Sequence, residues 1–426
     1  MMHLLSRLKS KGKALFLSLV SAACLAAGEP VFRLRGMRRG AGRTLPEMRR
    51  ILVVRLDQIG DVVLTLPLLR ELKRNAPLSR ITLVVKPELR DLALSCPDID
   101  EVLTFDWHLA RRSQDYKRRL RAVKFCIVHL WPRRFDLAIV PRWDADWYCQ
   151  TFIAYFSGAP QRIGYSEAVD PVKRIHNHSY DRLLTQCLPQ KSVAHEAERN
   201  LDILRALGGT AAGTSLAACS AAADDDWAQA WLDENAVDEN AVDENAVSAR
   251  PLIALGPFAG NSVLKQWPVS RFAALGRRLV AGGGAVVVVG GGGDREQAER
   301  ICAEIGPGAV SLAGAASLPQ TAALLRRCSL FVGDDSGPMH LAAAAGIPVI
   351  GLFGPSCPHR FSPWTPKKQV LWHPLPCSPC SVVKAGENHA DCCTVCIFPE
   401  PLCIQSITVE EVEAAVRKTA LFAGRL

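Results

Sequence analysis

One stretch, residues 331–355 with the sequence FVGDDSGPMHLAAAAGIPVIGLFGP, constrains the fold more than any other part of the chain. Its apolar start predicts a buried strand. Its small-residue run predicts a helix that begins at Pro338 and ends before Gly346, because proline and glycine favour these two ends of helices. A second apolar strand follows directly. Strand, helix and strand in this order predict a parallel α/β unit, in which a ligand binds beyond the carboxyl ends of the strands.

Polar residues follow the first of these strands. Asp335, Ser336 and Gly337 stand where the free N–H groups and the dipole of a helix N-terminus favour an anion. His340 comes one helical turn later, so its side chain can face the same site. These residues predict a binding site for an anionic ligand, although an N-cap with a tight glycine turn suits the same sequence in any α/β protein.

Strand-like and helix-like segments alternate along the rest of the chain as well. From residue 49, the segments ILVVRLD, ITLVV and FDLAIV predict strands with helical patterns between them, and PLIALG and AVVVVG begin a second series at residue 251. Such alternation predicts doubly wound parallel sheets, and 426 residues suit two domains. The predicted fold is therefore α/β, with two Rossmann-like domains that face a cleft.

This pattern divides the chain into four segments. They are a basic, partly apolar extension at 1–48, an N-terminal domain at 49–208, a linker at 209–250 and a C-terminal domain at 251–426. The linker contains an expected acidic helix around Trp227 and Trp231, followed by three copies of DENAV from Asp233 to Val247. A period of five residues matches neither a helix nor a strand, so the repeats predict a tolerated surface insertion.

The N-terminal extension is basic, with eleven Lys or Arg residues and two acids in residues 1–50. Its apolar run from Ala14 to Ala27 is shorter than the roughly 20 residues that span a membrane. The segment is close to a secretory signal in outline, and it also suits an amphipathic segment on the inner surface of a membrane. A second basic cluster lies between Arg111 and Lys124.

Charge alone does not distinguish nucleic acid, anionic lipid and a phosphorylated substrate as the partner of these clusters. The distribution of the cysteines argues against export, since six of the fifteen crowd into residues 377–403 and the others are scattered. We therefore expect a cytoplasmic protein that binds no nucleic acid and whose N-terminus makes peripheral contact with the inner membrane surface.

The cysteine-rich segment contains a C-x-x-C pair, Cys377 and Cys380, followed by further cysteines. Cys396 and Cys403 are the preferred second pair, and Cys393 could replace either of them. Thiolates at such spacing can hold zinc or iron in a tetrahedral structural site. The alternative is a set of reduced thiols without metal, which is usual in the cytosol.

Several segments are similar to those of glycosyltransferase family 9, the ADP-heptose:lipopolysaccharide heptosyltransferases. VGDDSGPMHLAAAAGIPVIGLFGP resembles the family signature near the C-terminus, and RLDQIGDVVLTLPLLRELK resembles the N-terminal signature. FIAYFSGAPQRIGY, HEAERNLDILRALG and GNSVLKQWP resemble segments between these two. The resemblance extends from about residue 50 to about residue 418, without the extension and the DENAV repeats.

The resemblance implies an inverting transfer of a sugar from a nucleoside diphosphate, with roles for single residues. Asp61, after Gly60 in the loop on the acceptor side, matches the catalytic aspartate that takes a proton from the acceptor hydroxyl, although an N-cap is its structural alternative. Lys265 matches a phosphate-binding lysine, and Asp335 matches the residue that holds donor sugar hydroxyls. The other matching donor-side residues are Gly260, Asn261, Ser336, Gly337 and His340.

The implied function is the transfer of a heptose or related sugar from an ADP-activated donor to a lipopolysaccharide core or another glycan. The alternative is a non-catalytic, metal-binding scaffold with the same fold, and the presence of both Asp61 and Lys265 favours the enzyme. The resemblance supplies no D-x-D metal pair, so we expect transfer to require no cofactor. The glycines at 290–293 lack the G-x-G-x-x-G pattern because Arg295 occupies its last position, which argues against a nicotinamide cofactor.

Overall fold

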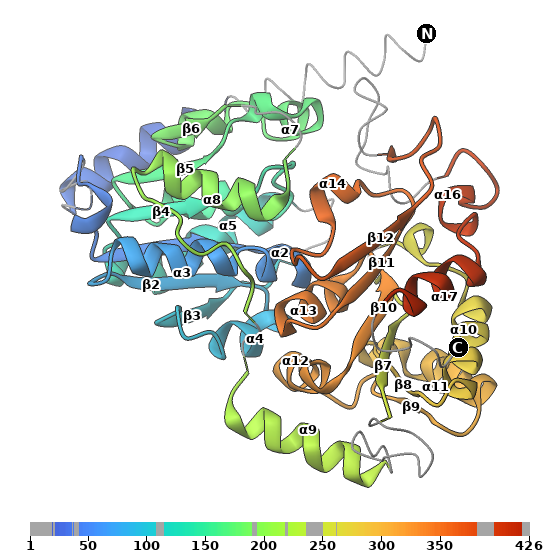
Figure 1. Ribbon diagram of the computed structural model, residues 1–426. Helices are drawn as coiled ribbons and strands as arrows, with labels where there is room; N and C mark the ends of the chain where they lie inside the picture. Colours follow the sequence, from blue (N-terminus) through green and yellow to red (C-terminus); the bar gives the residue numbers. More distant parts are fainter. Residues whose placement is uncertain are drawn as a thin grey trace, which may run out of the picture. The chain divides into compact units, whose positions relative to one another are not determined.

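The computed structural model describes residues 19, 22–35, 37, 42–107, 115–189, 194–217, 220–235, 250–260, 262–380 and 396–419. The chain divides into two units (Figure 1). The N-terminal unit is Met1–Asp57 with Thr65–Thr214, and the C-terminal unit is Gln58–Leu64 with Ser215–Leu426. The short segment from Gln58 to Leu64 thus belongs to the C-terminal unit, although the chain on both sides of it belongs to the N-terminal one.

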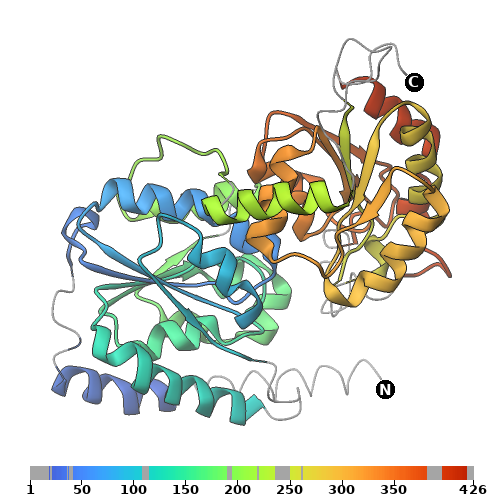
Figure 2. The same ribbon diagram turned by 90° about the horizontal axis from the view of Figure 1, so that it is seen from below.

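The N-terminal unit contains a six-stranded sheet in the order β3-β2-β1-β4-β5-β6, with all neighbours parallel. The strands are β1 (Arg50–Val54), β2 (Arg80–Val85), β3 (Glu101–Thr104), β4 (Leu137–Val140), β5 (Gln161–Tyr165) and β6 (Gln186–Leu188). The central strands are apolar on both faces because helices cover both faces of the sheet (Figure 2).

The larger helices of this unit are α3 (Leu66–Asn75), α4 (Arg90–Leu94), α5 (Asp115–Phe125), α6 (Gln150–Phe156), α7 (Pro171–His176) and α8 (Glu196–Ala206). Shorter helical segments are η1 (Leu45–Glu47), η2 (Pro87–Leu89), η4 (Cys126–Leu130), η5 (Trp131–Arg133), η6 (Glu167–Val169) and η7 (Tyr180–Leu183). Helix α3 packs against α8, and α5 packs against α6.

Part of the N-terminal extension packs onto the core of this unit. Residues 22–34 form a helix, and its Phe32 is fully buried. The ring of Phe32 lies edge-on to those of Tyr155, at 5.5 Å, and Trp131, at 6.1 Å. The hydroxyl group of Tyr155 donates a hydrogen bond to the carbonyl oxygen of Cys24 (3.0 Å). The extension therefore contributes to the folded unit before residue 49.

The C-terminal unit contains a second six-stranded parallel sheet, in the order β12-β11-β10-β7-β8-β9. The strands are β7 (Leu252–Gly256), β8 (Ala285–Val288), β9 (Ala309–Ser311), β10 (Leu330–Asp334), β11 (Val349–Phe353) and β12 (Lys368–Trp372). The helical segments are α2 (Ile59–Val63), α9 (Ala222–Glu234), η8 (Val263–Lys265), α10 (Val269–Ala281), η9 (Gly292–Asp294), α11 (Arg295–Ile305), α12 (Leu318–Arg327), α13 (Gly337–Ala345), α14 (Pro358–Phe361), α16 (Leu402–Gln405) and α17 (Val409–Arg417).

Both sheets have the doubly wound strand order of a Rossmann fold. In each of them the fourth strand along the chain lies beside the first, which pairs β1 with β4 and β7 with β10. The direction of winding changes at these two pairs, and ligands bind at such points beyond the carboxyl ends of the strands. The predicted α/β fold with two Rossmann-like domains is confirmed, and each unit has its own candidate site.

The segment predicted as a linker has a folded part. Helix α9 packs against α12 of the C-terminal unit, and Arg326 of α12 pairs with Asp225 and Ser220. Asp233 and Glu234 of the first DENAV copy end α9, whereas residues 236–249 lie outside the described residues. In the described part of the chain, no helix is long and apolar enough to cross a membrane.

Candidate functional site

The centre of the C-terminal unit is an ion pair at the point where the winding of its sheet changes. Asp335 directly follows β10, and Lys265 ends the short helix η8 after β7. The Nζ atom of Lys265 lies 2.7 Å from Oδ2 of Asp335, and both side chains are largely buried. The strand order thus brings together two predicted donor-side residues that are 70 positions apart in the sequence.

A second basic group lies on the other side of the Asp335 carboxylate. Nε2 of His340, a residue of α13, is 4.0 Å from Oδ1 of Asp335. Burial alone would raise the pKa of Asp335, but the Lys265 ammonium and the His340 ring outweigh burial and hold this pKa below its usual value. Asp335 is therefore an anion, held between two basic groups at the N-terminus of α13.

The neighbouring carboxyl group, Asp334, has the opposite character. It is fully buried, and its Oδ1 accepts a hydrogen bond from the backbone N–H of Trp267 (3.0 Å). Burial, with a contribution from the Asp335 charge, raises the pKa of Asp334 well above its usual value. Burial therefore favours the neutral form of Asp334, whose Oδ1 holds the segment after Lys265.

The neutral state of Asp334 predicts a change of stability with pH. The ordinary pKa of an aspartate, 3.8, applies to Asp334 in the unfolded chain, and folding raises this pKa. Above pH 3.8 the folded protein still holds the proton that the unfolded chain has lost, so the wild-type protein loses stability as the pH rises towards the pKa of the folded state. The variant Asp334→Asn does not titrate and can still accept the hydrogen bond from Trp267. Urea unfolding between about pH 5 and pH 8 should show the variant gaining stability relative to wild type as the pH rises. A constant difference between the two proteins would contradict a protonated Asp334.

Two glycines allow helix α2 to lie against α13. A Cβ atom added to Gly60 would lie 2.5 Å from Cδ2 of His340, and one added to Gly337 would lie 2.7 Å from Cβ of Ile59. Both distances are shorter than carbon atoms tolerate. Gly60 and Gly337, predicted from the sequence as site residues, therefore have a defined physical role, which is to place α2 beside the His340 ring.

The variant Gly60→Ala is expected to destabilise the C-terminal unit by about 1–3 kcal/mol, because the new methyl group must displace the buried His340 ring. Thermal or denaturant unfolding measures this loss. The matched control is Gly260→Ala, since a Cβ atom at Gly260 meets nothing within 4 Å and should change stability by less than about 0.5 kcal/mol. Equal stabilities of the two variants would contradict the close packing at Gly60.

Asp61, the predicted catalytic residue, lies in the first turn of α2 and is partly exposed. Its Oδ2 accepts a hydrogen bond from the backbone N–H of Gln58 (3.1 Å), so the helix-capping alternative considered from the sequence is present in the structure. Asp61 directly follows Gly60, the residue that contacts His340. The predicted acid–base residue and the predicted donor-side helix therefore meet within one unit.

Three other residues were predicted on the donor side, and their surroundings in the structure differ. Ser336 is the N-cap residue of α13, and its Oγ atom has no hydrogen-bond partner among the described residues. Gly260 lies in an exposed turn with open space around it, so its surroundings do not require a glycine. Asn261 lies outside the described residues.

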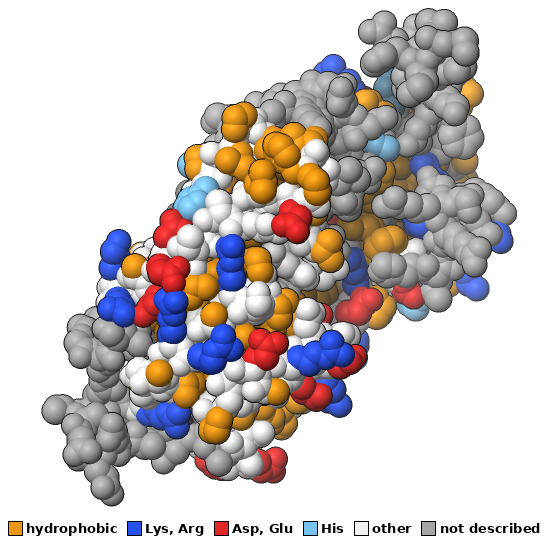
Figure 3. Space-filling view, turned by 90° about the vertical axis from the view of Figure 1, so that its right-hand side faces the viewer, with side chains coloured by type: hydrophobic (Ala, Val, Ile, Leu, Met, Phe, Trp, Pro, Cys, Tyr) orange, Lys and Arg blue, Asp and Glu red, His pale blue; other side chains and the backbone are white. Residues whose placement is uncertain are grey.

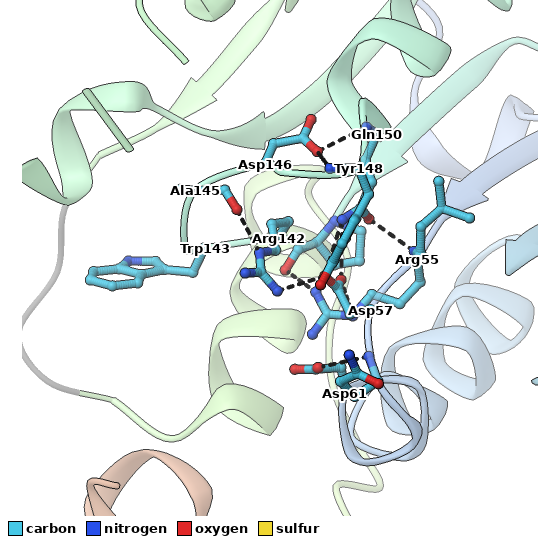
Figure 4. Close-up of polar contacts among 12 residues, drawn as sticks. Arg55, Asp57, Asp61, Arg142, Trp143, Ala145, Asp146, Tyr148 and Gln150 are labelled. Atoms are coloured by element: carbon cyan, nitrogen blue, oxygen red, sulfur yellow. Dashed lines mark hydrogen bonds and ion pairs between the residues drawn. The ribbon is translucent and has the colours of Figure 1, made fainter. Parts of the chain in front are cut away.

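The N-terminal unit has a buried charged cluster at the corresponding point of its own sheet (Figure 4). Asp57 follows β1 and is fully buried between two guanidinium groups. Nε of Arg55 lies 3.2 Å from Oδ2 of Asp57, and Nη1 of Arg142, after β4, lies 2.5 Å from Oδ1. Gln150 of α6 donates from Nε2 to both carboxylate oxygens at 3.2 Å.

Two positive groups and one carboxylate leave this cluster with one formal positive charge. Arg55 is 1% exposed, but the Arg142 side chain remains 15% exposed, so Arg142 is the accessible end of the cluster. A partly exposed guanidinium at the edge of a sheet suits a carboxylate or phosphate ligand. These residues were not predicted from the sequence. The pattern that could have indicated them is the charged Arg-Leu-Asp directly after the first strand.

Three of the four cysteines predicted as metal ligands lie near one another. Burial raises the pKa of the Cys403 thiol, and the neighbouring Cys396 and Cys377 act in the same direction. Cys380 donates its backbone N–H to the carbonyl oxygen of Pro355 (2.9 Å). Within the described ranges, however, no three His, Cys, Asp or Glu side chains converge closely enough to hold a metal ion. Metal binding by these cysteines therefore stays a prediction.

The same segment carries exposed apolar side chains. Figure 3 looks onto the side of the C-terminal unit drawn at the right of Figure 1, and apolar side chains gather on part of this face. The large exposed apolar residues of the segment are Ile397, Phe398 and Leu402. Apolar side chains are thus exposed in the same segment as Cys396 and Cys403, which follow Asp335 and Lys265 in the sequence.

Comparisons with known proteins find a matching family and similar relatives. The model of glycosyltransferase family 9 (heptosyltransferase) matches residues 132–390. Among curated proteins, the lipopolysaccharide heptosyltransferase 2 of Salmonella typhimurium is 25% identical over 330 residues, which cover 76% of this chain and 87% of the relative.

Solved structures share the fold. A glycosyltransferase family 9 protein from Veillonella parvula is 23% identical, with a TM-score of 0.68, over 88% of this chain and 97% of the other. The dodecameric, iron-containing heptosyltransferase TibC of enterotoxigenic E. coli, solved in complex with ADP-D-beta-D-heptose, is 16% identical, with a TM-score of 0.51, over 88% and 77%.

Proposed function

This chain belongs to glycosyltransferase family 9, the heptosyltransferase family, and on that premise we propose that it transfers a heptose or a related sugar from an ADP-activated donor to the core of lipopolysaccharide or to another glycan. The enzymatic interpretation of the sequence is thereby preferred over a non-catalytic scaffold. The observation that carries the proposal is the buried pair of Lys265 and Asp335 at the N-terminus of α13.

The donor diphosphate is assigned to this pair and to the first turn of α13. The N-terminus of the helix offers free backbone N–H groups at Ser336 and Gly337, and Lys265 adds a positive charge beside them. The pairing of Lys265 with Asp335 fixes the ammonium before a ligand arrives, which is the preorganisation that stabilises a developing negative charge. Asp335 is the group proposed to accept a hydrogen bond from a sugar hydroxyl. ADP-D-beta-D-heptose bound to TibC supports the choice of nucleotide and sugar.

The chemical step that we propose is an inverting displacement. The acceptor hydroxyl oxygen forms a bond to the anomeric carbon of the donor sugar, and the bond from that carbon to the phosphate oxygen breaks. Asp61 takes the hydroxyl proton as a general base, and the nucleoside diphosphate leaves with the bonding electron pair. Lys265 and the N–H groups of α13 stabilise the leaving charge. No step requires a metal or a redox cofactor.

Arg142 is assigned to the acceptor. Its guanidinium is the accessible part of the Arg55–Asp57–Arg142 cluster, and its positive charge suits a carboxylate or phosphate of a lipopolysaccharide core. The Arg55–Asp57–Arg142 cluster belongs to the N-terminal unit, and the donor-side residues Lys265 and Asp335 belong to the C-terminal unit.

A panel of nucleotide sugars tests the proposal. ADP-heptose should raise the melting temperature of the protein more than the UDP and GDP sugars do, because a ligand that binds only the folded state stabilises it. Mass spectrometry of a truncated lipopolysaccharide acceptor, incubated with the stabilising donor, should then show the addition of one sugar. Stabilisation by no nucleotide sugar, or a donor that is only hydrolysed, would refute transfer.

A structural metal at the cysteine-rich segment remains a separate prediction. The iron of TibC and the proximity of Cys377, Cys396 and Cys403 support it. Protein purified under reducing conditions should contain about one zinc or iron per chain, and a strong chelator should lower its melting temperature. Sub-stoichiometric metal, with a melting temperature that the chelator does not change, would leave only reduced thiols. As a control, the variant Cys187→Ser lacks an exposed thiol outside this segment, and its metal content and melting temperature should equal those of wild type.

We also propose that the protein works in the cytoplasm. The twelve described cysteines are all free thiols, which suits a reducing compartment. Peripheral contact with the inner membrane surface, expected from the basic extension, would bring the enzyme to a lipid-linked acceptor.

A further inference from the structure

The helix at residues 22–34 lies along the helical segments from α5 through η4 to Trp131, the first residue of η5, in the N-terminal unit. Electrostatic interaction with Arg119 of α5 lowers the pKa of Cys24, against the larger effect of burial, which raises it. At the other end of the helix, Phe32 packs on Trp131, and the Arg35 guanidinium lies 4.7 Å from the centre of the Trp131 ring. The two helical segments therefore run side by side in the same direction (Figure 2).

Each segment buries one side against the core and exposes an apolar stripe on its other side. In the first helix, Ala23, Ala26, Pro30 and Leu34 are exposed at intervals of three or four residues. Leu34 is 88% exposed. Phe32 already anchors this helix to the core, so packing within the unit does not explain the exposed apolar stripe. A stripe with this spacing is typical of a surface that binds a partner.

The second segment also exposes residues three or four positions apart, namely Lys117, Leu120, Lys124, Ile127 and Val128, and it exposes His129 as well. Leu120 is 65% exposed and Val128 is 53% exposed. Apolar and basic side chains thus alternate along this stripe, which distinguishes it from the apolar patch that a folded partner protein would cover.

Positive charge accompanies both stripes. The first helix exposes Arg33, and Arg35 follows it, while Glu29, its one acid in residues 22–34, lies 4.0 Å from Arg162. In α5 the exposed basic residues are Lys117 and Lys124. Leucine and isoleucine beside lysine and arginine form the surface that partitions into the headgroup region of an anionic bilayer.

We propose that the helix at residues 22–34, together with α5 and η4, forms a docking surface for an anionic lipid bilayer. Leu34, Leu120, Ile127 and Val128 enter the boundary between headgroups and acyl chains, and Arg33, Lys117 and Lys124 contact the lipid phosphates. The N-terminal unit, which carries Arg142, is then the unit that is held at the membrane. The surface lies outside the donor residues, so the proposal does not depend on the identity of the sugar transferred.

Co-sedimentation of the full chain with vesicles tests this proposal without donor or acceptor. The protein should bind phosphatidylcholine vesicles that contain phosphatidylglycerol, bind weakly to phosphatidylcholine alone, and dissociate as salt is added. The double variant Arg33→Ala/Lys124→Ala should lower the partition coefficient about 25-fold, since each basic residue near an anionic surface contributes about fivefold. The double variant Leu34→Ser/Leu120→Ser should lower it by at least about tenfold.

Matched controls come from exposed residues elsewhere. Leu78, between α3 and β2, is 71% exposed, and Leu78→Ser should bind vesicles as wild type does. The variant Arg277→Ala/Arg300→Ala in the C-terminal unit makes the same change of net charge and should also bind normally. Transfer to a soluble acceptor should be unchanged in all of these variants, so a failure of vesicle binding is distinguishable from a failure of the proposed activity.

Two results would overturn the proposal. One concerns vesicle binding: either the two surface variants bind anionic vesicles as strongly as the wild-type chain does, or the wild-type chain does not bind them at all. The other is a fall in molar mass of a surface variant in light scattering, from a dimer to a monomer, because a second copy of the chain would then cover the surface.

Discussion

The variant Asp61→Asn should lose turnover by about 10²- to 10⁴-fold, the contribution of a general base, while its affinity for the donor stays within about twofold of wild type. Asparagine keeps the shape of the side chain and can still accept the hydrogen bond from the backbone N–H of Gln58 (3.1 Å in wild type), so helix α2 remains capped. Only proton abstraction is removed. Single-turnover rates and calorimetric donor binding measure the two quantities separately.

The control for this experiment is Asp61→Ala, which removes the base and the helix cap together. If capping were the whole role of Asp61, the asparagine variant would retain activity and the alanine variant would lose stability. If Asp61 is the base, both variants lose turnover, and only alanine lowers the melting temperature. Wild-type turnover in Asp61→Asn would remove Asp61 from the mechanism.

The variant Lys265→Ala should show two losses at once. Donor affinity should fall by about 10- to 100-fold, because a charge-assisted contact with a phosphate contributes about 1.5–3 kcal/mol. The C-terminal unit should also lose about 3–5 kcal/mol of stability, because Asp335, with its side chain 6% exposed, would stay charged without its ammonium partner. Calorimetry with ADP and denaturant unfolding measure these two losses.

A double variant separates the two roles of the lysine. Lys265→Met/Asp335→Asn removes both charges of the buried pair and should recover most of the stability that Lys265→Ala loses. It should not recover affinity for ADP, since no ammonium is present to meet the phosphates. If Lys265→Ala or Lys265→Met/Asp335→Asn is folded and binds ADP with wild-type affinity, Lys265 stabilises the fold and does not bind the phosphates.

The fold was predictable because its strands are short, apolar and separated by helical patterns, and these properties are local. The division of the first helical pattern was not predictable in the same way. The segment from Ile59 to Asn75 has continuous helical spacing, yet the structure splits it into α2 and α3, with Pro67 in the first turn of α3. Helix α2 also packs against α13, at Gly60 beside His340, a residue that is distant in the sequence.

The candidate site shows the same limit. The turn after a strand is a local signal, and it identified Asp335 and His340, whereas Lys265 was predicted from the family resemblance alone. Their pairing depends on the strand order, which places β7 beside β10. The charged Arg-Leu-Asp after the first strand hinted at Asp57, but its ion pair with Arg142 was missed because the pair forms only when β4 lies beside β1.

The membership of α2 in the C-terminal unit has a consequence for how the protein is made. A ribosome that has released residues 1–214 has delivered every strand of the N-terminal sheet, but the surface that α2 contacts includes His340, more than a hundred residues from being synthesised. Val62 and Val63 of α2 are buried in the complete protein, and the partner helix α13 is not yet made at that point. The nascent chain therefore waits in a state with an exposed apolar segment, which a chaperone can bind. For the same reason, a C-terminal half expressed alone from residue 215 would lack Gln58–Leu64, which belongs to its unit.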